Sequence, residues 1–163
     1  MNILYIFLAK YFFILSPLIL GIYFMYLPLS SKKKMAIFAL TALIFTYILG
    51  VAAGYLYFDP RPFVVGHFAP LIPHAPDNGF PSDHALFVSG LAMVGLYWSR
   101  RLGIALWIIA ILVSIGRVLV GVHHFVDVAG SMLIAIIGVS LMYYTIKNIN
   151  TKYLHKTPDL NQY

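Results

Sequence analysis

The chain has 163 residues, of which 61% are hydrophobic and only 10% are charged, with a formal net charge of +6. A soluble domain is about half apolar, so this composition excludes a soluble protein and predicts a polytopic membrane protein. The absence of cysteine excludes disulfides, thiol catalysis and iron–sulfur chemistry. The basic residues are too few and scattered to indicate a nucleic-acid partner, and they are better explained as topology signals.

Five apolar segments meet or approach the roughly 20 residues that a helix needs to cross a membrane. They are residues 11–29, 35–57, 84–98, 103–122 and 125–146. The first is longer than a signal-peptide core and lacks a small-residue cleavage site, so we expect a retained helix preceded by a short interfacial segment carrying Lys10. The third is short and should begin below the membrane surface. The sequence therefore predicts an all-α fold, in which residues 1–163 form one domain of about five transmembrane helices.

The only long connection is residues 58–82, whose prolines and glycines preclude a continuous helix. Basic residues follow the first, third and fifth segments: Lys32, Lys33, Lys34, Arg100, Arg101, Lys147, Lys152 and Lys156. With five crossings all of them lie on one side, which an excess of lysine and arginine marks as cytoplasmic. Of the acids and histidines, only His155 and Asp159 fall on that side. Ionisable groups beside membrane segments indicate a functional site, and we expect a single site facing the extracytoplasmic side.

The first polar cluster is FDPRP at residues 58–62. Arg61 lies between two prolines on a stiff, extended backbone, and its guanidinium is a planar fork of donors that suits phosphate oxygens. The alternative is a surface arginine that binds lipid headgroups.

The second cluster is PSDH at residues 81–84, immediately before an apolar run. Proline followed by serine is typical of a helix start, with Ser82 as its cap, and free backbone N–H groups at such a start bind anions. His84 would lie on the first turn beside the anion. Asp83 would repel a phosphate, so its simplest explanation is favourable placement at a helix N-terminus. The alternative for the cluster is a plain helix cap followed by an interfacial histidine.

The third cluster is GRVLVGVHHFVD at residues 116–127. Arg117 lies close enough to the end of the fourth segment for its head to reach the outer surface. His123 and Asp127 are four residues apart and would share a helix face. An Asp–His pair sets the imidazole tautomer and supports cationic character in a reacting histidine; the alternative is a buried polar pair between helices. His124 points elsewhere on a helix, and we assign it no catalytic role.

Together the clusters contain two arginines, a helix start with a hydroxyl, and two histidines, one of which has a carboxylate partner. This set amounts to an anion pocket with a nucleophile and a general acid. Phosphoryl transfer requires little else than positioning, neutralisation of the charge on the phosphate oxygens and a proton for the leaving group.

The order RP, PS-x-H and R-x5-H-x3-D resembles the type 2 phosphatidic acid phosphatase (PAP2) superfamily, whose pattern is K-x6-RP, PSGH and SR-x5-H-x3-D. The resemblance covers residues 54–127. It implies that His123 is the nucleophile and forms a phosphohistidine, that Asp127 orients it, and that His84 protonates the leaving oxygen. The phosphate-binding positions correspond to Arg61, Ser82, Asp83 and Arg117. The resemblance also implies catalysis without a metal ion or another cofactor.

Three positions depart from this pattern: Gly54 replaces the lysine, Asp83 replaces the glycine of PSGH, and Gly116 replaces the serine before Arg117. Lys10 is one candidate to replace the missing lysine. The stretches FDPRPF, LIPH-x-PD and FPSDHA are similar to bacterial undecaprenyl-diphosphate phosphatases of the bacitracin-resistance type, a branch that often carries PSDH and lacks the lysine.

This narrower resemblance implies hydrolysis of undecaprenyl diphosphate to undecaprenyl phosphate and inorganic phosphate, at the extracytoplasmic side of the bacterial cytoplasmic membrane. We expect His67, His74 and Asp77 of the long loop to shape the diphosphate end of the pocket; an ordinary polar loop is the alternative.

Other functions remain as alternatives. Another lipid phosphatase, acting on phosphatidic acid, phosphatidylglycerol phosphate or lipid A phosphate, or a lipid phosphotransferase, would use the same catalytic residues. A zinc enzyme or metal transporter is disfavoured because the chain has no H-E-x-x-H motif and no glutamate, and because two arginines would repel a cation. A purely structural membrane protein would leave the arginine–histidine spacing unexplained. The sequence does not specify an oligomeric state.

Overall fold

The computed structural model describes residues 2–154, with side chains described for residues 2–148. The described residues form helices and no strand: α1 (Asn2–Lys10), a 3-10 turn (Phe12–Ile14), α2 (Leu15–Met25), α3 (Leu29–Leu56), α4 (Pro62–Val65), α5 (Asp83–Trp98), α6 (Arg100–Leu119) and α7 (Phe125–Leu154). The expected all-α fold is confirmed. The topology assignments for His155, Lys156 and Asp159 lie outside the described residues.

Four helical segments within residues 2–148 are long and apolar enough to cross a membrane: Asn2–Met25, Leu29–Leu56, Arg100–Leu119 and Phe125–Asn148. The first corrects the prediction, because α1, the 3-10 turn and α2 follow one another almost without interruption from residue 2. The expected separate segment before residue 11 is therefore part of the first span. Lys10 interrupts the apolar pattern of the sequence but not the path of the helix.

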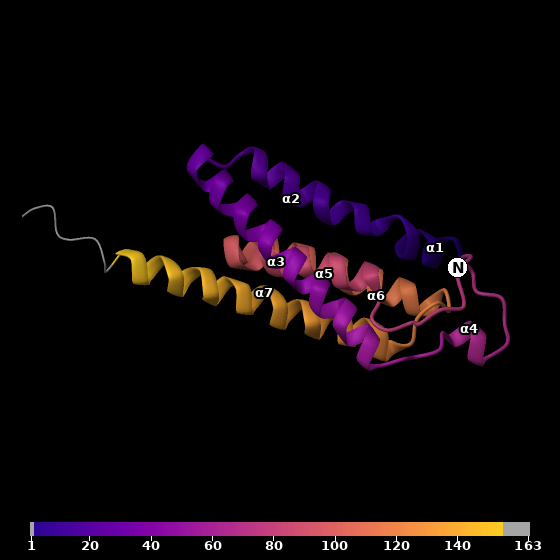
Figure 1. Ribbon diagram of the computed structural model, residues 1–163. Coiled ribbons are helices and arrows are strands. Elements are labelled where there is room, and N and C mark those ends of the chain that lie inside the picture. The colour runs from indigo at the N-terminus through magenta and orange to yellow at the C-terminus, as the bar shows by residue number, and fades with distance from the viewer. Residues whose placement is uncertain (1, 155–163) are drawn as a thin grey trace, which may run out of the picture.

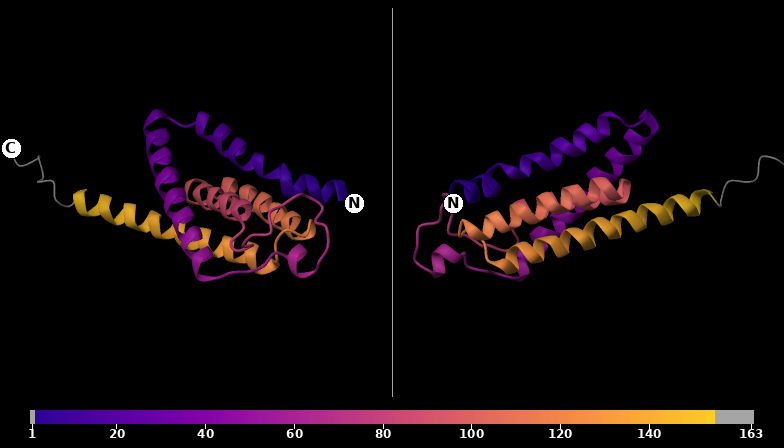
Figure 2. Two further views of the ribbon diagram at one scale, coloured as in Figure 1. Left: turned by 45° about the vertical axis from the view of Figure 1, so that its right-hand side comes forward. Right: turned by 180° about the vertical axis from the view of Figure 1, so that it is seen from behind.

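Helix α5 lies at the centre of the bundle (Figures 1 and 2) and packs against α3, α6 and α7. It has only 16 residues, and almost every side chain between Ala85 and Gly95 is buried. Because protein rather than lipid surrounds it, α5 can be short and can begin with polar residues. The short third segment expected from the sequence is thus the core helix of the fold.

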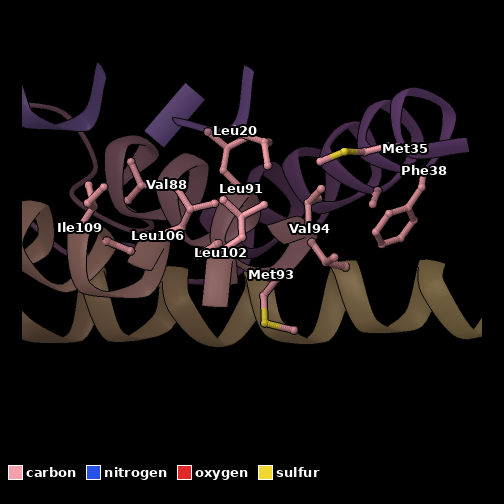
Figure 3. Packing of buried hydrophobic residues seen from close by; sticks show 14 of the residues in the cluster. Leu20, Met35, Phe38, Val88, Leu91, Met93, Val94, Leu102, Leu106 and Ile109 are labelled. Atoms are coloured by element: carbon pink, nitrogen blue, oxygen red, sulfur yellow. The ribbon is translucent and has the colours of Figure 1, made fainter. Parts of the chain in front are cut away.

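The main hydrophobic core joins α2, α3, α5 and α6, as Figure 3 shows for Leu20, Phe38, Leu91 and Leu106. Small residues let the helices approach closely, as is typical of membrane helix interfaces. A Cβ added at Gly138 of α7 would lie 2.5 Å from the Thr46 Oγ1 atom of α3, so this crossing requires glycine.

The two ends of the bundle differ in charge. The N-terminus, the loop 58–82 with α4, and the α6–α7 turn lie at one end, whereas the α2–α3 turn and the α5–α6 turn lie at the other (Figure 1). The first end carries all four acids of the described chain: Asp59, Asp77, Asp83 and Asp127. The second end carries most of the basic residues: Lys32, Lys33, Lys34, Arg100, Arg101 and Lys147. The charge asymmetry expected from the sequence is therefore present in the fold.

Candidate active site

The structure brings both arginines of the motifs onto one face of a histidine. The Nε2 atom of His123, in the α6–α7 turn, lies 3.3 Å from Nη1 of Arg61 and 3.3 Å from Nη2 of Arg117. Arg61 precedes α4, and Arg117 lies in the last turn of α6. All three side chains are buried. Within the described residues Arg117 forms no salt bridge. The positive charges of the two guanidinium groups therefore lie together beside Nε2 of His123.

The opposite side of the His123 ring is bound to two oxygen atoms. Its Nδ1 atom lies 2.9 Å from the carbonyl oxygen of Gly79 and 3.3 Å from Oδ2 of Asp127. Two acceptors place the proton on Nδ1, so Nε2 carries the lone pair and directs it between the arginines. A histidine held in this tautomer is equipped to attack an electrophile that the arginines bind.

The surroundings also keep this histidine neutral. Burial lowers the pKa of His123 most, the hydrogen bond with Asp127 raises it, and the charges of Arg117 and Arg61 lower it further, so that the pKa lies below its ordinary value of 6.5. At neutral pH the ring is therefore uncharged, as a nucleophile must be.

The Arg61 side chain is held by the long loop. Its Nε atom donates to Oδ1 of Asp77 at 2.7 Å, its Nη1 atom to the carbonyl oxygen of Val122 at 2.9 Å, and its Nη2 atom to the carbonyl oxygen of Asn78 at 3.2 Å. Burial raises the pKa of the Asp77 carboxyl, but the hydrogen bond and charge of Arg61 outweigh this effect and leave the pKa below its usual range. The Asp77 carboxylate is thus ionised and bound to Arg61.

The PSDH motif forms the start of α5, although Ser82 differs from the expectation. Ser82 occupies the N-cap position with an extended backbone, but its hydroxyl makes no capping hydrogen bond. Instead, the buried Oγ atom has no hydrogen-bond partner in the protein. The prediction that the Ser82 side chain caps the helix was therefore wrong. A buried hydroxyl without a partner is unfavourable unless a ligand binds it.

His84, in the first turn of α5, lies edge-on to Phe13 of the 3-10 turn, with 5.0 Å between ring centres. Its imidazole interacts electrostatically with Arg117, His123 and His74. His84 therefore belongs to the same group of side chains. Asp83 is exposed and lines a cavity of about 250 Å³ between α3 and α5, together with Arg61 and Asp77.

Of the two loop histidines, only His74 lies at the site. Its ring centre is 6.1 Å from that of His123. Burial lowers the pKa of His74, and the charges of Arg61 and Arg117 lower it further. His67 is exposed, has a φ of 50° and takes no part in the contacts around His123.

The comparisons with known proteins agree with this geometry. Residues 35–151, most of the chain, match the PAP2 superfamily.

The chain belongs to the PAP2 superfamily.

Among its relatives, undecaprenyl-diphosphatase BcrC of Bacillus subtilis (strain 168) is 35% identical over 136 residues, which are 81% of this chain and 68% of that protein. The putative undecaprenyl-diphosphatase YbjG of Escherichia coli (strain K12) is 31% identical over 82% of this chain and 67% of its own length. The resemblance inferred from the sequence motifs is confirmed.

Two solved structures share the PAP2 fold at 22% identity. Aquifex aeolicus LpxE has a TM-score of 0.71, covering 88% of this chain and 85% of that chain. The PAP2-type phosphatidylglycerolphosphate phosphatase of Bacillus subtilis has a TM-score of 0.58, covering 90% and 74%. Together with the apolar helices, these relatives identify the chain as a multi-pass membrane protein.

Sequence reasoning missed Asn78, which joins the long loop to the end of α3. Its Oδ1 atom accepts from the backbone N–H groups of Asp59 and Phe80, at 2.9 and 3.0 Å. Its Nδ2 atom donates to the carbonyl oxygens of Gly54 and Tyr57, at 2.9 and 3.0 Å. The dipeptide Asn78–Gly79 indicates a turn, but no local signal reveals partners so far away in the sequence.

A second missed feature is the hydrogen bond between Asp59 and His124, with 2.9 Å between Oδ2 and Nδ1. It joins the segment that carries Arg61 to the turn that carries His123. Asp59, His124 and Asp127 each carry an atom that could bind a metal ion. In the described chain these three atoms lie within 4.8 Å of one another, as a metal site would require. Hydrogen bonds explain this clustering without a cation, since Asp59 binds His124 and Asp127 binds His123 and the backbone N–H of His124.

Two departures from the PAP2 pattern have structural consequences. A Cβ at Gly116 would lie 2.8 Å from Ala9 N, so the glycine allows α1 to pack directly on α6. At Gly54, where the family has lysine, a Cβ would lie 3.1 Å from the carbonyl oxygen of Phe80, so the loop backbone crosses close to this position. Lys10 lies over the ring of Tyr11, 5.3 Å from its centre, and does not take part in the contacts around His123.

Proposed function

We propose that this PAP2 protein hydrolyses undecaprenyl diphosphate to undecaprenyl phosphate and inorganic phosphate. The observation that carries the proposal is the lone pair of His123 Nε2 directed between two buried guanidinium groups, each 3.3 Å away. Two arginines without a protein anion between them form a site for a strongly anionic group. The names of the relatives from Bacillus subtilis and Escherichia coli support a polyprenyl diphosphate as that group.

In the proposed mechanism, His123 Nε2 attacks the terminal phosphorus. An N–P bond forms as the bond from phosphorus to the bridging oxygen breaks, and undecaprenyl phosphate leaves. Arg61 and Arg117 neutralise the charge on the equatorial oxygens. The positive charge that develops on the ring is stabilised by Asp127 through the Nδ1 proton.

His84 is the proposed general acid, which gives a proton to the leaving oxygen. In the second step it takes a proton from the water that attacks the phosphohistidine, and inorganic phosphate is released with both histidines restored. The position of His84 in the first turn of α5, at the helix start proposed to bind the terminal phosphate, supports this role. The charges of Arg117 and His123 disfavour a proton on His84, so the negative charge of the bound diphosphate is proposed to favour its protonated form.

The other contacts with the substrate are proposed from the positions of the side chains around His123. The hydroxyl of Ser82, which lacks a protein partner, and the first N–H groups of α5 are proposed to bind the terminal phosphate. His74 is proposed to contact the second phosphate, and Asp77 to act through Arg61. The cavity between α3 and α5 is lined by polar residues such as Arg61 and Asp83 and by apolar or aromatic ones such as Tyr47 and Val51, a mixed lining that suits the first isoprenoid unit.

The assay for this function is phosphate release by purified protein in detergent from a panel of lipids. Undecaprenyl diphosphate should be the best substrate by at least about tenfold, and hydrolysis in ¹⁸O-water should place one ¹⁸O atom in the released phosphate. A preference for phosphatidic acid, phosphatidylglycerol phosphate or lipid A phosphate would replace this substrate assignment with the rival one. Transfer of the phosphate to a second lipid without incorporation of ¹⁸O would identify a phosphotransferase.

We propose further that the site faces the extracytoplasmic side of the bacterial cytoplasmic membrane, because the basic residues gather at the opposite end of the bundle. The chain has no cysteine, so an Ala75→Cys variant carries a single thiol in the exposed part of the loop beside His74. A membrane-impermeant maleimide should label it in intact cells. Labelling only after the cells are broken would reverse the orientation.

A further inference from the structure

The end of the bundle opposite the active site carries a groove that the proposed reaction does not use. It lies between α3, α5 and α7 and encloses about 520 Å³, a volume within the range of about 300–1,000 Å³ that is typical of small-molecule sites. Phe38, Tyr97, Trp98 and Tyr143 contribute aromatic surface, and two basic residues, Lys34 and Lys147, complete the lining with isoleucines.

The aromatic floor of this groove is ordered by its own contacts. The rings of Tyr97 and Tyr143 stack with 4.1 Å between centres and 18° between planes. Phe38 lies edge-on to both, at 6.1 and 5.9 Å. These rings come from three different helices, so the floor is a built surface rather than a chance gap between them.

The charged residues that the structure describes around the groove are all basic. Lys34 and Lys147 line it, and further basic residues lie at the same end of the bundle: Lys32, Lys33, Arg100 and Arg101. The four acids within residues 2–148 all lie at the other end. A ligand that matches this groove therefore combines an apolar body with an anionic head at the membrane surface.

We propose that the groove binds an anionic phospholipid, with an acyl chain against the aromatic floor and the phosphate group between Lys34 and Lys147. Tyrosine and tryptophan favour the boundary between hydrocarbon and headgroups, and basic pockets between membrane helices bind anionic headgroups. A soluble anion would leave the apolar lining unused, and a neutral lipid would not match the excess of basic residues at this end of the bundle. This site is separate from the proposed phosphatase site and does not depend on its function.

Trp98 provides a direct probe, because it lines the groove whereas Trp107, the other tryptophan of the chain, does not. A Trp107→Phe protein would be placed in phosphatidylcholine bilayers that contain increasing fractions of lipid with brominated acyl chains, which quench tryptophan on contact. Brominated phosphatidylglycerol should quench Trp98 at mole fractions at least about threefold lower than brominated phosphatidylcholine does.

Variants test the role of the lysines. Lys34→Gln combined with Lys147→Gln should bring the phosphatidylglycerol curve onto the phosphatidylcholine curve. The matched control, Lys33→Gln with Arg101→Gln, removes the same charge from the same end but outside the groove, and should keep the preference. Lys34→Arg, which retains the charge, should also keep it and shows that substitution at this position is tolerated.

The proposal is overturned if the two brominated lipids quench equally, or if the Lys34/Lys147 variant keeps the preference. It is also overturned if neither lipid quenches Trp98, since another protein surface would then fill the groove. The readout is fluorescence in the absence of substrate, so failure here leaves the proposed phosphatase function untouched.

Discussion

Replacement of Asp127 by asparagine tests how the reacting histidine is held. In a serine-protease triad the equivalent change lowers kcat about 10⁴-fold, because the imidazole adopts the wrong tautomer. Here the His123 Nδ1 proton has a second acceptor, the carbonyl oxygen of Gly79, which at 2.9 Å is nearer than the carboxylate oxygen at 3.3 Å. The backbone oxygen should keep the tautomer when the carboxylate charge is lost.

The expected cost is therefore only the difference between a charged and a neutral hydrogen bond. A hydrogen bond to a charged group contributes about 1.5–3 kcal/mol and a neutral one about 0.5–1.5 kcal/mol. The difference of about 1–2 kcal/mol corresponds to a decrease of about 5- to 30-fold in kcat. The fold should survive, because Oδ1 of Asp127 is already buried without a partner, and an amide nitrogen there exchanges one unpaired polar atom for another.

The pH dependence of kcat/KM should shift in opposite directions when Asp127 and Arg117 are replaced. His123 must be neutral to attack, so kcat/KM falls as pH drops through its pKa, which lies below 6.5. The hydrogen bond with Asp127 raises that pKa, so Asp127→Asn should move the acidic limb to lower pH. The charge of Arg117 lowers it, so Arg117→Gln should move the limb to higher pH, in addition to reducing the rate.

The assay is kcat and kcat/KM for phosphate release from pH 4 to pH 9, with circular dichroism to verify the fold of both variants. A loss near 10⁴-fold for Asp127→Asn would refute the idea that Gly79 maintains the tautomer. A loss below about threefold would remove Asp127 from the mechanism. Limbs that shift in the same direction in the two variants would contradict the electrostatic account of His123.

Three further outcomes are expected. Gly79→Ala should lower kcat at least about tenfold, because its Cβ would lie 2.9 Å from Oδ2 of Asp127, whereas Gly21→Ala, with nothing within 4 Å, should be neutral; equal effects would show that the steric argument fails. Asp59→Asn and His124→Gln should each lower kcat severalfold and be non-additive when combined, as contacting residues are; full additivity in a double-mutant cycle would show that the Asp59–His124 hydrogen bond does not hold the site together. Excess chelator should leave the rate unchanged, since arginines supply the positive charge, and a loss that a divalent ion restores would count against the mechanism.

The hydropathy of the sequence was sufficient to predict most of the helices. Hydropathy located α3, α6 and α7, and the short apolar run after PSDH located α5, although its burial at the centre of the bundle was not predicted. The exception was the first span, where Lys10 interrupts the apolar pattern although α1 continues the helical path from residue 2. One lysine lowers the local hydropathy strongly, although its long side chain can extend towards water, so hydropathy underestimates such a helix.

Part of the candidate site could likewise be predicted from the sequence, and part could not. The motif spacing identified Arg61, Arg117 and His123, which the structure brings into contact. Ser82 was placed correctly at the start of α5, but the idea that its hydroxyl caps the helix was wrong. Whether a hydroxyl bonds to its own helix or faces another segment depends on what packs around it, which the local sequence does not encode.

By itself, the sequence determined that this protein is a bundle of membrane helices with its acids and reactive groups at one end. Hydropathy and charge are properties of the individual residues and do not depend on tertiary contacts. Only the tertiary structure decided how the reactive groups are held: the Gly79 oxygen behind His123, the Asp77 partner of Arg61 and the Asp59–His124 pair. These contacts join a loop without periodicity to helices far along the chain. Their geometry exists only after the helices have packed.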